Sequence, residues 1–267
     1  MNTQESSTAA AFSKQSKHFD EEDLQNPVLQ WMRAEVYKHL SAFLTPGSNL
    51  LELNCGTGID AIHFAALGIQ VYATDNAPGM LETLNEKILD KGLQQNIQTQ
   101  LCSFNHLENI TEQNFDQVFS NFGGLNCTND LSSIITKLKP LLKKNAIVTW
   151  VVMPPLCPWE WLYALKGNFK LAFRRLKKQG VISHLENEAF TTYYFSLARL
   201  KKDFGKDFEL IKVQGLGTLT PPPHAQKFYT RFPRIIKLLQ RMDGRTAQIF
   251  PFNRMADHII VSMRYKG

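Results

Sequence analysis

The sequence predicts an α/β protein built on a doubly wound, mostly parallel β-sheet, and three observations support this fold class. Short apolar segments alternate with segments of helical periodicity between residues 28 and 153. A glycine bend, Gly56-Thr57-Gly58, directly follows the first apolar segment. An acidic residue, Asp75, ends the second one. Together these features are typical of parallel strands joined by right-handed helical crossovers.

The first elements follow in regular alternation. A helix is predicted from Val28 to Leu44, because apolar residues recur there at helical spacing until Pro46-Gly47 turns the chain. Four elements are expected next: a strand at Asn49–Asn54, a helix at Ile59–Leu67, a strand at Gln70–Asp75, and a helix that starts near Pro78 and runs through Met80, Leu84 and Ile88 to Gly92.

Five further strands complete the expected sheet of seven strands, and one more helix lies between them. The strands are expected at Ile97–Ser103, Phe115–Phe122, Ala146–Met153, Phe208–Gly217 and His258–Tyr265, and the helix at Leu131–Leu142. Two interruptions, at about 154–205 and 218–254, begin at prolines. We expect both to be cap insertions over the carboxyl ends of the strands.

Composition limits the class of protein. The 267 residues include 43% hydrophobic residues, enough for a sizeable core, and the net charge of +6 permits an anionic partner without requiring one. The four cysteines are far apart and show no spacing typical of a metal site or a disulfide scaffold, so we expect a reduced, cytoplasmic setting and no metal. No apolar run is long enough to span a membrane.

The domain organisation is expected to be simple. Residues 1–16 are polar and lack the apolar core of a secretion signal. We therefore expect residues 1–17 to be a flexible tail and residues 18–267 to be a single domain, monomeric or homodimeric.

The glycine bend and Asp75 indicate a site for an adenosine-containing cofactor. Gly56 and Gly58 allow unusual backbone angles, and a carboxylate at Asp75 can accept hydrogen bonds from both hydroxyls of a ribose. Residues 56–61 formally fit the dinucleotide fingerprint, which keeps a nicotinamide-dependent oxidoreductase as a distant alternative. Glu52 favours S-adenosylmethionine (SAM) instead, since a carboxylate suits an ammonium group and repels a pyrophosphate.

The segment Glu52-Leu53-Asn54-Cys55-Gly56-Thr57-Gly58 resembles the first motif of class I SAM-dependent methyltransferases, which commonly reads E/D-x-G-x-G-x-G. Asn54 replaces the first glycine, and asparagine is the non-glycine residue that best tolerates a left-handed conformation. The resemblance implies a Rossmann-like methyltransferase fold, SAM as the cofactor and the small-molecule branch of the family, similar to its type 11 and type 25 members.

The resemblance also implies cofactor-binding residues by position. The residue aligned with Asp75 bonds the ribose, those aligned with Ser103-Phe104 lie near the adenine, and those at Asn121–Asn126 lie beside the transferred methyl group. Phe19-Asp20 resembles a segment that folds over the cofactor as a lid. The full expected set is Phe19, Arg33, Glu52, Asn54, Cys55, Gly56, Thr57, Gly58, Asp75, Asn76, Met80, Ser103, Phe104, Asn121, Phe122 and Gly123.

Several of these positions have ordinary structural alternatives. Asp75 can cap a helix, Glu52 can form a buried ion pair, and Phe104 can pack in the core. Arg33 can reach the methionine carboxylate or lie solvated on a helix face.

The first insertion contains a basic, amphipathic stretch. Apolar residues recur from Leu162 to Leu176 at helical spacing, with basic residues along one flank. This pattern suits a cap helix that packs on the sheet, the interpretation we favour, or a lid that makes transient contact with a membrane surface or an anionic carrier. Aromatic residues of the insertion, such as Trp159 and Tyr194, can line an apolar substrate chamber.

The expected reaction is methyl transfer to a small organic acceptor with apolar character. Motifs for methylating nucleic-acid bases, for a cysteine-dependent mechanism and for a metal-dependent catechol site are absent, and the basic residues are spread along the sequence, so we expect no nucleic-acid partner. No general base is singled out among the candidates, which are His18, His184, His224, Tyr193 and Tyr229. A SAM-binding protein without catalysis therefore stays an alternative.

Overall fold

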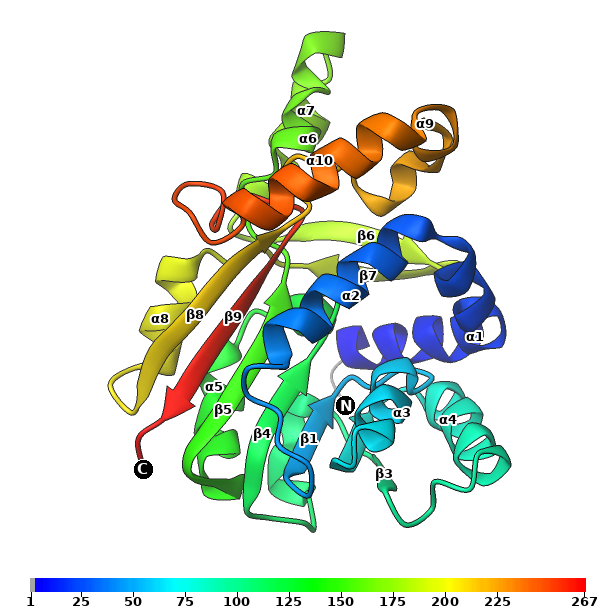
Figure 1. Ribbon diagram of the computed structural model, residues 1–267, viewed down its shortest axis with the longest axis vertical. Helices are drawn as coiled ribbons and strands as arrows, with labels where there is room; N and C mark the ends of the chain where they lie inside the picture. Colours follow the sequence, from blue (N-terminus) through cyan, green and yellow to red (C-terminus); the bar gives the residue numbers. More distant parts are fainter. Residues whose placement is uncertain (1–2) are drawn as a thin grey trace.

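The computed structural model describes residues 3–267 and confirms the α/β fold class (Figure 1). Its main sheet has the strand order β3-β2-β1-β4-β5-β9-β8. The strands are β1 Asn49–Leu53, β2 Gln70–Asp75, β3 Ile97–Leu101, β4 Phe115–Ser120, β5 Leu142–Val152, β8 Phe208–Leu216 and β9 His258–Tyr265. The neighbours among β1 to β5 are parallel, whereas β9 runs antiparallel between β5 and β8. The seven predicted strands are all present.

Helices cover both faces of this sheet and bury two apolar clusters. On one face lie α2 (Pro27–Leu40), α3 (Ile59–Ala66) and α4 (Pro78–Asp90), and on the other lie α5 (Leu131–Leu138) and α8 (Leu197–Phe204). The interior strand β1 contributes to both clusters, because neighbouring side chains on a strand point to opposite faces. The site at its end therefore rests on the most buried part of the fold.

The entry to α2 shows how sequence determines an element boundary. The side chain of Asn26 accepts hydrogen bonds from the backbone N–H groups of Val28 and Leu29, and Pro27 occupies the first helical position. Such a cap contributes about 1 kcal/mol and needs no tertiary contact. This boundary could therefore be predicted from local sequence alone.

Residues 3–17 differ from the flexible tail that we expected at residues 1–17, whereas residues 1 and 2 lie outside the described residues. Residues Thr3–Gln25 form helix α1, which packs against α4 of the main domain and against a two-stranded hairpin (Figure 1). The run Ala9-Ala10-Ala11 favours a helix, and Ala9 and Ala11 are buried. Polarity alone suggested a tail, but the small buried side chains of α1 allow a close approach to its neighbours.

In the first insertion, the apolar and basic residues between Leu162 and Leu176 do not lie on one continuous helix. Residues 158–176 form four short turns: α6 Pro158–Trp161, η4 Ala164–Lys166, α7 Phe169–Ala172 and η5 Arg174–Leu176. Gly167 adopts a φ of 75°, and the Asn168 side chain starts a new turn by accepting a hydrogen bond from the Leu171 N–H. This break at Gly167-Asn168 shortens the helix.

A hairpin that the sequence did not reveal follows in the same insertion. Strand β6 (Val181–Leu185) pairs with β7 (Glu188–Thr192), and the two turn residues Glu186 and Asn187 have φ angles of 50° and 63°. Two consecutive left-handed residues are the geometry of a tight hairpin turn. Glutamate rarely occupies such a position, which explains why the turn was missed.

The second insertion is helical. It contains η6 Pro223–Ala225, α9 Gln226–Arg231 and α10 Pro233–Thr246. Short 3-10 segments elsewhere are η1 Phe104–Asn109, η2 Gly124–Cys127 and η3 Lys139–Leu141. Within residues 3–267, no helix combines the length and apolarity needed to cross a bilayer.

Candidate functional site

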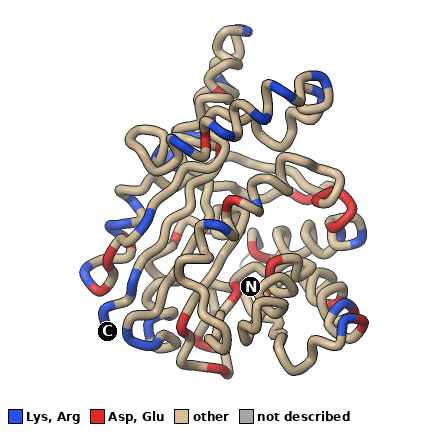
Figure 2. Tube along the Cα trace, in the orientation of Figure 1, with Lys and Arg blue, Asp and Glu red and all other residues tan. Residues whose placement is uncertain are grey.

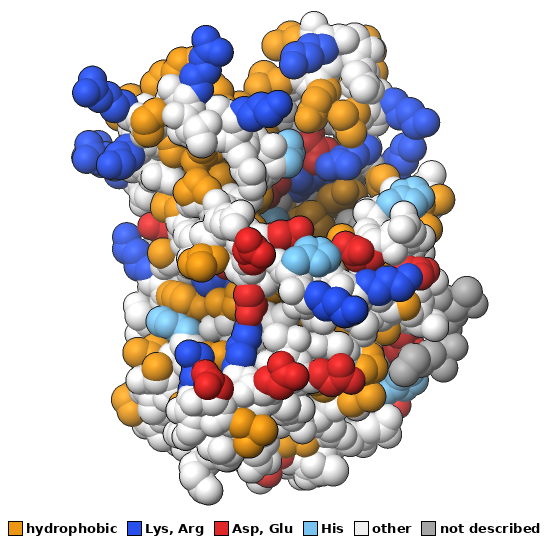
Figure 3. All heavy atoms as spheres, turned by 90° about the vertical axis from the view of Figure 1, so that its right-hand side faces the viewer, with side chains coloured by type: hydrophobic (Ala, Val, Ile, Leu, Met, Phe, Trp, Pro, Cys, Tyr) orange, Lys and Arg blue, Asp and Glu red, His pale blue; other side chains and the backbone are white. Residues whose placement is uncertain are grey.

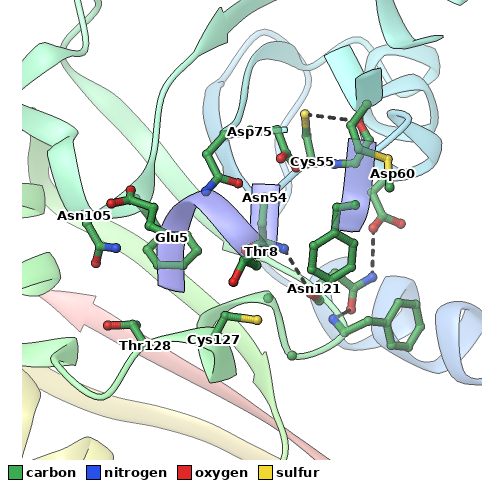
Figure 4. Close-up of a pocket in the computed structure, with 18 of the residues that line it drawn as sticks. Glu5, Thr8, Asn54, Cys55, Asp60, Asp75, Asn105, Asn121, Cys127 and Thr128 are labelled. Atoms are coloured by element: carbon green, nitrogen blue, oxygen red, sulfur yellow. Dashed lines mark hydrogen bonds between the residues drawn. The ribbon is translucent and has the colours of Figure 1, made fainter. Parts of the chain in front are cut away.

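A cavity of about 340 Å³ lies at the carboxyl edge of the parallel strands. Its wall contains residues from the glycine bend after β1, from the ends of β2 and β4, and from α1 (Figure 4). In Figure 4, Asp60 and Asn121 lie on one side of the cavity, and Glu5 and Asn105 lie on the other. Carboxyl ends of parallel strands are the usual place for a ligand in this architecture.

The bend after β1 has the backbone that its sequence predicted. Asn54, Gly56 and Gly58 have φ angles of 49°, 56° and 79°, so the asparagine that replaces glycine does adopt a left-handed conformation. Its side chain also holds the bend to β4, because it accepts a hydrogen bond from the Ser120 hydroxyl at 2.6 Å and donates one to the Asn121 carbonyl at 3.1 Å. A glycine at position 54 would lose both bonds.

Gly58 is required by packing as well as by conformation. A Cβ at this position would lie 2.1 Å from Cδ1 of Leu84 on α4. The close approach allows α3 to start directly against α4. Gly56 differs, since a Cβ there would meet only the Met80 sulfur at 3.9 Å, and it lines the cavity.

Asp75 lies in the cavity wall with both carboxylate oxygens engaged. Oδ2 accepts a hydrogen bond from the Gly56 N–H, and Oδ1 accepts one from the Ala77 N–H, each at 2.9 Å. Burial raises the pKa of this carboxyl, while the backbone N–H groups lower it. The bond from Gly56 connects the end of β2 to the glycine bend, the bond from Ala77 holds the turn after β2, and each oxygen keeps a second acceptor position for a ligand.

A buried charge network forms the other end of the cavity. The Asp60 carboxylate accepts hydrogen bonds from Arg33 at 2.5 Å, Tyr37 at 2.6 Å and Asn121 at 2.9 Å. Burial alone would raise the Asp60 pKa, but Arg33 and the two other donors outweigh it and lower the pKa. Asp60 was not among the predicted site residues, although it lies in the first turn of α3.

Arg33 is not the solvated side chain that its helix position suggested. It is 5% exposed, forms ion pairs with Asp60 and with Asp23 at 2.6 Å, and stacks over the Phe122 ring at 4.8 Å. Its Nε atom is buried without a hydrogen-bond partner within residues 3–267. The arginine therefore lies in the cavity wall with one unused donor.

Glu52 lies beneath the cavity and is not part of its wall. The side chain is 1% exposed, and Oε2 has no hydrogen-bond partner in the described chain. Burial, followed by the charge of Asp60, raises the pKa of this carboxyl well above its usual range, and Arg33 partly opposes the effect. The expected direct contact between Glu52 and a ligand ammonium is not evident in this geometry.

Twelve of the sixteen predicted residues line the cavity: Phe19, Arg33, Asn54, Cys55, Gly56, Asp75, Asn76, Met80, Phe104, Asn121, Phe122 and Gly123. Glu52, Thr57, Gly58 and Ser103 do not line it. Thr57 instead donates a hydrogen bond to Asp20, and the Ser103 hydroxyl accepts one from the Asn105 N–H. These two residues shape the segments that hold the wall.

Sequence reasoning missed the contribution of α1 to the wall. Gln4, Glu5, Thr8 and Phe12 line the cavity in addition to the predicted Phe19. The spacing of three or four residues between these positions was a usable signal for one helix face. Further wall residues come from the segments after β4 and after β7, among them Cys127, Thr128, Asn129 and Tyr193.

Glu5 is the most unusual of these residues. It is 9% exposed, and its Oε1 atom is buried without a hydrogen-bond partner in the described part of the chain. Its other oxygen lies 3.9 Å from His106, which places the carboxylate beside the segment after β3. An unpartnered buried carboxylate oxygen in a cavity wall is available to a hydrogen-bond donor on a ligand.

Only one of the five expected base candidates, Tyr193, lines the cavity. Tyr193 is held by Asn126, which donates a hydrogen bond to its carbonyl at 2.5 Å and accepts one from its N–H at 2.7 Å. Among the other candidates, Tyr229 donates its hydroxyl proton to the Pro221 carbonyl at 2.8 Å. His18 pairs with Glu22 and Glu186 on the surface.

The insertion is fixed to the sheet by a second buried network. Arg175 pairs with Glu160 and with Asp257, each at 2.8 Å, and the Asp257 carboxylate also pairs with Nδ1 of His258 at 3.0 Å. Burial would raise the Asp257 pKa, but His258 and Arg175 lower it. His258 Nε2 lies 3.6 Å from the position of a Cβ on Gly123, so this network reaches the back of the cavity wall.

The residues present fit SAM. Its ammonium and sulfonium charges match the acidic side chains of Glu5, Asp60 and Asp75, and its carboxylate matches Arg33, whose Nε is an unused donor. The same acidic set is unsuited to a pyrophosphate at the bend, which argues against the dinucleotide alternative.

Comparisons with known proteins agree with this geometry. Residues 50–145 match the family model described as a methyltransferase domain. The search of curated proteins gives no match.

Solved structures share the fold over most of the chain. An S-adenosylmethionine dependent methyltransferase assigned in Listeria monocytogenes is 17% identical, with a TM-score of 0.61 over 88% of this chain and 98% of that one. The 1,6-didemethyltoxoflavin-N1-methyltransferase of Burkholderia thailandensis, with its substrate and S-adenosylhomocysteine (SAH) bound, is 13% identical, with a TM-score of 0.58 over 98% and 88%. The DhpI–SAH complex is 13% identical, with a TM-score of 0.59 over 99% and 98%.

These likenesses support the fold. The family match covers the glycine bend, Asp75 and the Asn121 segment, which are the features that the sequence singled out. Residues 50–145 therefore belong to a methyltransferase domain, and the chain as a whole has the fold of SAM-dependent methyltransferases.

Proposed function

We propose that this protein methylates a small organic acceptor with apolar character, and that the cavity described above holds SAM and the acceptor together. The observation that carries the proposal is the mixed wall of this one cavity. Polar groups suited to SAM, including Asp75 and Arg33, share it with the aromatic side chains of Phe12, Phe104 and Tyr193.

The two ends of the cavity have different tasks in this proposal. Arg33 and Asp60 bind the amino-acid end of SAM, and Asp75 accepts hydrogen bonds from the ribose hydroxyls. Phe104, at the segment after β3, packs against the adenine. All sixteen residues predicted from sequence are proposed to bind or support the cofactor, with Glu52, Thr57, Gly58 and Ser103 acting from behind the wall.

When bound, SAM supplies a methyl group activated by the positive sulfonium. The protein then contributes alignment and exclusion of water, and alignment alone can lower a barrier by roughly 7–11 kcal/mol. Helix α1 covers the cavity and excludes water, because Gln4 to Phe12 contact it from one side. Tyr193 presents a hydroxyl to the acceptor, to orient it or to receive a hydrogen bond from it.

Calorimetry with SAH tests the cofactor part of the proposal. The intact protein is expected to bind SAH, and Asp75→Ala is expected to weaken binding at least about tenfold, since a hydrogen bond to a charged group is worth about 1.5–3 kcal/mol. Asp116→Ala is a matched control, because Asp116 also accepts a backbone N–H but lies at the opposite edge of the sheet. Undetectable SAH binding by the intact protein would overturn the proposal.

A panel of small acceptors tests the second part. SAH production is expected with acceptors that carry an apolar ring or chain, and not with acceptors that are polar throughout. Tyr193→Phe is expected to lower turnover of the active acceptor while leaving SAH affinity unchanged. Equal turnover of polar and apolar acceptors would contradict the apolar character that we propose.

A further inference from the structure

Thirteen of the 30 Lys and Arg residues lie in two segments at one end of the folded protein. Segments 156–178 and 227–254 contain 13 Lys and Arg residues but only two acidic ones, Glu160 and Asp243. The remaining chain contains 17 basic and 22 acidic residues. In Figure 2, blue segments gather over α7, α9 and α10, and red segments lie mostly below them. We call the surface of these two segments the basic end.

The two acidic residues of the basic end are buried, so they place no negative charge on its surface. Glu160 and Asp243 are 2% and 3% exposed. Glu160 is paired with Arg174 and Arg175, and Asp243 accepts hydrogen bonds from the N–H groups of Leu219 and Thr220. The exposed charges of the basic end are therefore all positive among the described residues.

Exposed apolar side chains gather on the same surface. Of the 17 large hydrophobic side chains that are exposed in residues 3–267, twelve belong to the basic end. They include Leu165 at 84%, Phe169 at 62% and Phe250 at 68% exposure. Figure 3 shows orange and blue side chains side by side on the two upper lobes, with a hollow between them. Soluble surfaces rarely concentrate apolar groups in this way unless a partner covers them.

On helix α10 the exposed apolar and basic side chains form separate stripes. Ile236 and Asp243 face the protein and are buried. One exposed stripe is apolar and consists of Ile235, Leu238 and Met242; a neighbouring exposed stripe is basic and consists of Arg234, Lys237, Arg241 and Arg245. Adjacent residues on a helix differ by about 100° in direction, so the apolar and basic stripes lie next to each other.

We propose that the basic end docks on an anionic lipid membrane. Apolar side chains beside a row of lysine and arginine suit the boundary between acyl chains and negative headgroups, where the apolar groups insert and the cationic groups stay at the headgroups. Both segments leave the sheet at the edge where the cavity opens, because β5 and β8 end there. Docking therefore brings the cavity close to the lipid surface.

Other occupants fit the basic end less well. A second copy of this chain would bring a second set of unopposed positive charges to the same face. A nucleic acid would use the basic residues but leave the aliphatic stripe of Ile235, Leu238 and Met242 without a stacking or base-edge role. The charge pattern and the aliphatic stripe together favour lipid.

Vesicle flotation with the full chain tests the proposal. The protein is expected to float with vesicles of phosphatidylcholine and phosphatidylglycerol, and not with phosphatidylcholine alone. Raising the salt concentration is expected to weaken binding, because the first attraction is electrostatic. Failure to bind the anionic vesicles at 100 mM salt would overturn the proposal.

Variants separate a lipid surface from other anionic partners. A triple variant with I235S, L238S and M242S keeps the net charge and is expected to lose vesicle binding at least about tenfold. A second variant with R234Q, K237Q and R241Q is expected to lose it as well. A matched control with K201Q, K202Q and K206Q removes three exposed charges near α8 and is expected to bind almost as well as the intact protein.

Two readouts make each outcome decisive. Binding of short duplex DNA or RNA that equals vesicle binding and is unaffected by the serine variant would overturn the lipid assignment. Calorimetry with SAH is expected to be unchanged in all three variants, because the substituted residues lie outside the cavity wall. Loss of vesicle binding with intact SAH binding thus tests the docking surface independently of the proposed function.

Discussion

Thr57 in the glycine bend donates a hydrogen bond of 2.5 Å to Asp20 in helix α1. The same carboxylate pairs with Lys87 of α4, and Lys87 in turn donates to the Thr57 carbonyl at 2.9 Å. The end of α1 is therefore tied to the bend that forms the floor of the cavity. Cofactor binding and the position of α1 are expected to depend on each other.

Removing this connection gives the first prediction. Asp20→Ala is expected to weaken SAH binding roughly tenfold and to speed amide exchange in α1, because the lost hydrogen bond involves a charged group. Calorimetry and hydrogen exchange measure the two effects. Glu21→Ala is the control, since Glu21 accepts a hydrogen bond from Gln25 of the same helix. Equal SAH affinity in the Asp20 and Glu21 variants would contradict the connection.

Glu5 gives a prediction in which stability and binding change in opposite directions. Glu5→Leu removes a buried carboxylate with an unpartnered oxygen, so the protein without ligand is expected to gain about 1 kcal/mol, or roughly 2–4 °C in melting temperature. SAH affinity is expected to fall, because the cavity loses an acceptor. Thermal unfolding with and without SAH measures both effects, and a variant that gains SAH affinity would refute the role of Glu5 in binding.

His39 gives a prediction about pH. Burial, with a smaller effect from Lys212, lowers the pKa of His39 from 6.5 to about 4, and its ring nitrogens meet Gln214 and Ser262. The folded state holds the neutral ring, so the unfolded state binds more protons below pH 6.5. The contribution of neutral His39 to the free energy of unfolding is therefore complete above pH 6.5. It is lost as the pH falls towards 4, by up to about 3 kcal/mol.

Urea unfolding between pH 7 and pH 4 measures this loss. His39→Gln is expected to reduce the pH dependence in that range, whatever its stability at pH 7. The exposed His184→Gln is expected to keep the slope of the intact protein. An unchanged slope in the His39 variant would show that the loss comes from other groups.

Arg175 gives a prediction about the insertion. Arg175→Ala leaves the carboxylates of Glu160 and Asp257 without their shared buried partner, at an expected cost of about 3–5 kcal/mol. Arg174→Ala is expected to cost about 1 kcal/mol or less, because the Arg174 side chain is 36% exposed. Urea unfolding measures the loss in free energy of unfolding for both variants. Equal losses would mean that burial of the Arg175 ion pairs adds nothing to stability.

Local rules explain what the sequence could reveal. The backbone angles of Asn54, Gly56 and Gly58 follow from steric limits on each residue. The position of Asp75 beside the glycine bend follows from the lengths of the helix and the strand that separate them. The parallel, doubly wound arrangement follows from the alternation of elements and from the handedness of crossovers. These features depend on neighbours that are close in the sequence.

Long-range contacts explain what it could not. Gln4 donates hydrogen bonds to the carbonyls of Cys127 and Thr191, more than 120 residues away, and such contacts turn a polar segment into part of the site. Asp60 belongs to the site because Arg33, Tyr37 and Asn121 all donate hydrogen bonds to it in the folded protein. The spacing along α1 could indicate a helix face, but neither arrangement indicates which distant residues that face or Asp60 will contact.

The uneven distribution of charge gives the molecule a permanent electric dipole moment along the line from the acidic body to the basic end. A negatively charged boundary exerts a torque on such a molecule before contact is made, so that the molecule arrives with its basic end facing the boundary. This pre-orientation raises the fraction of collisions that are productive, and the gain diminishes as added ions shorten the range of the field.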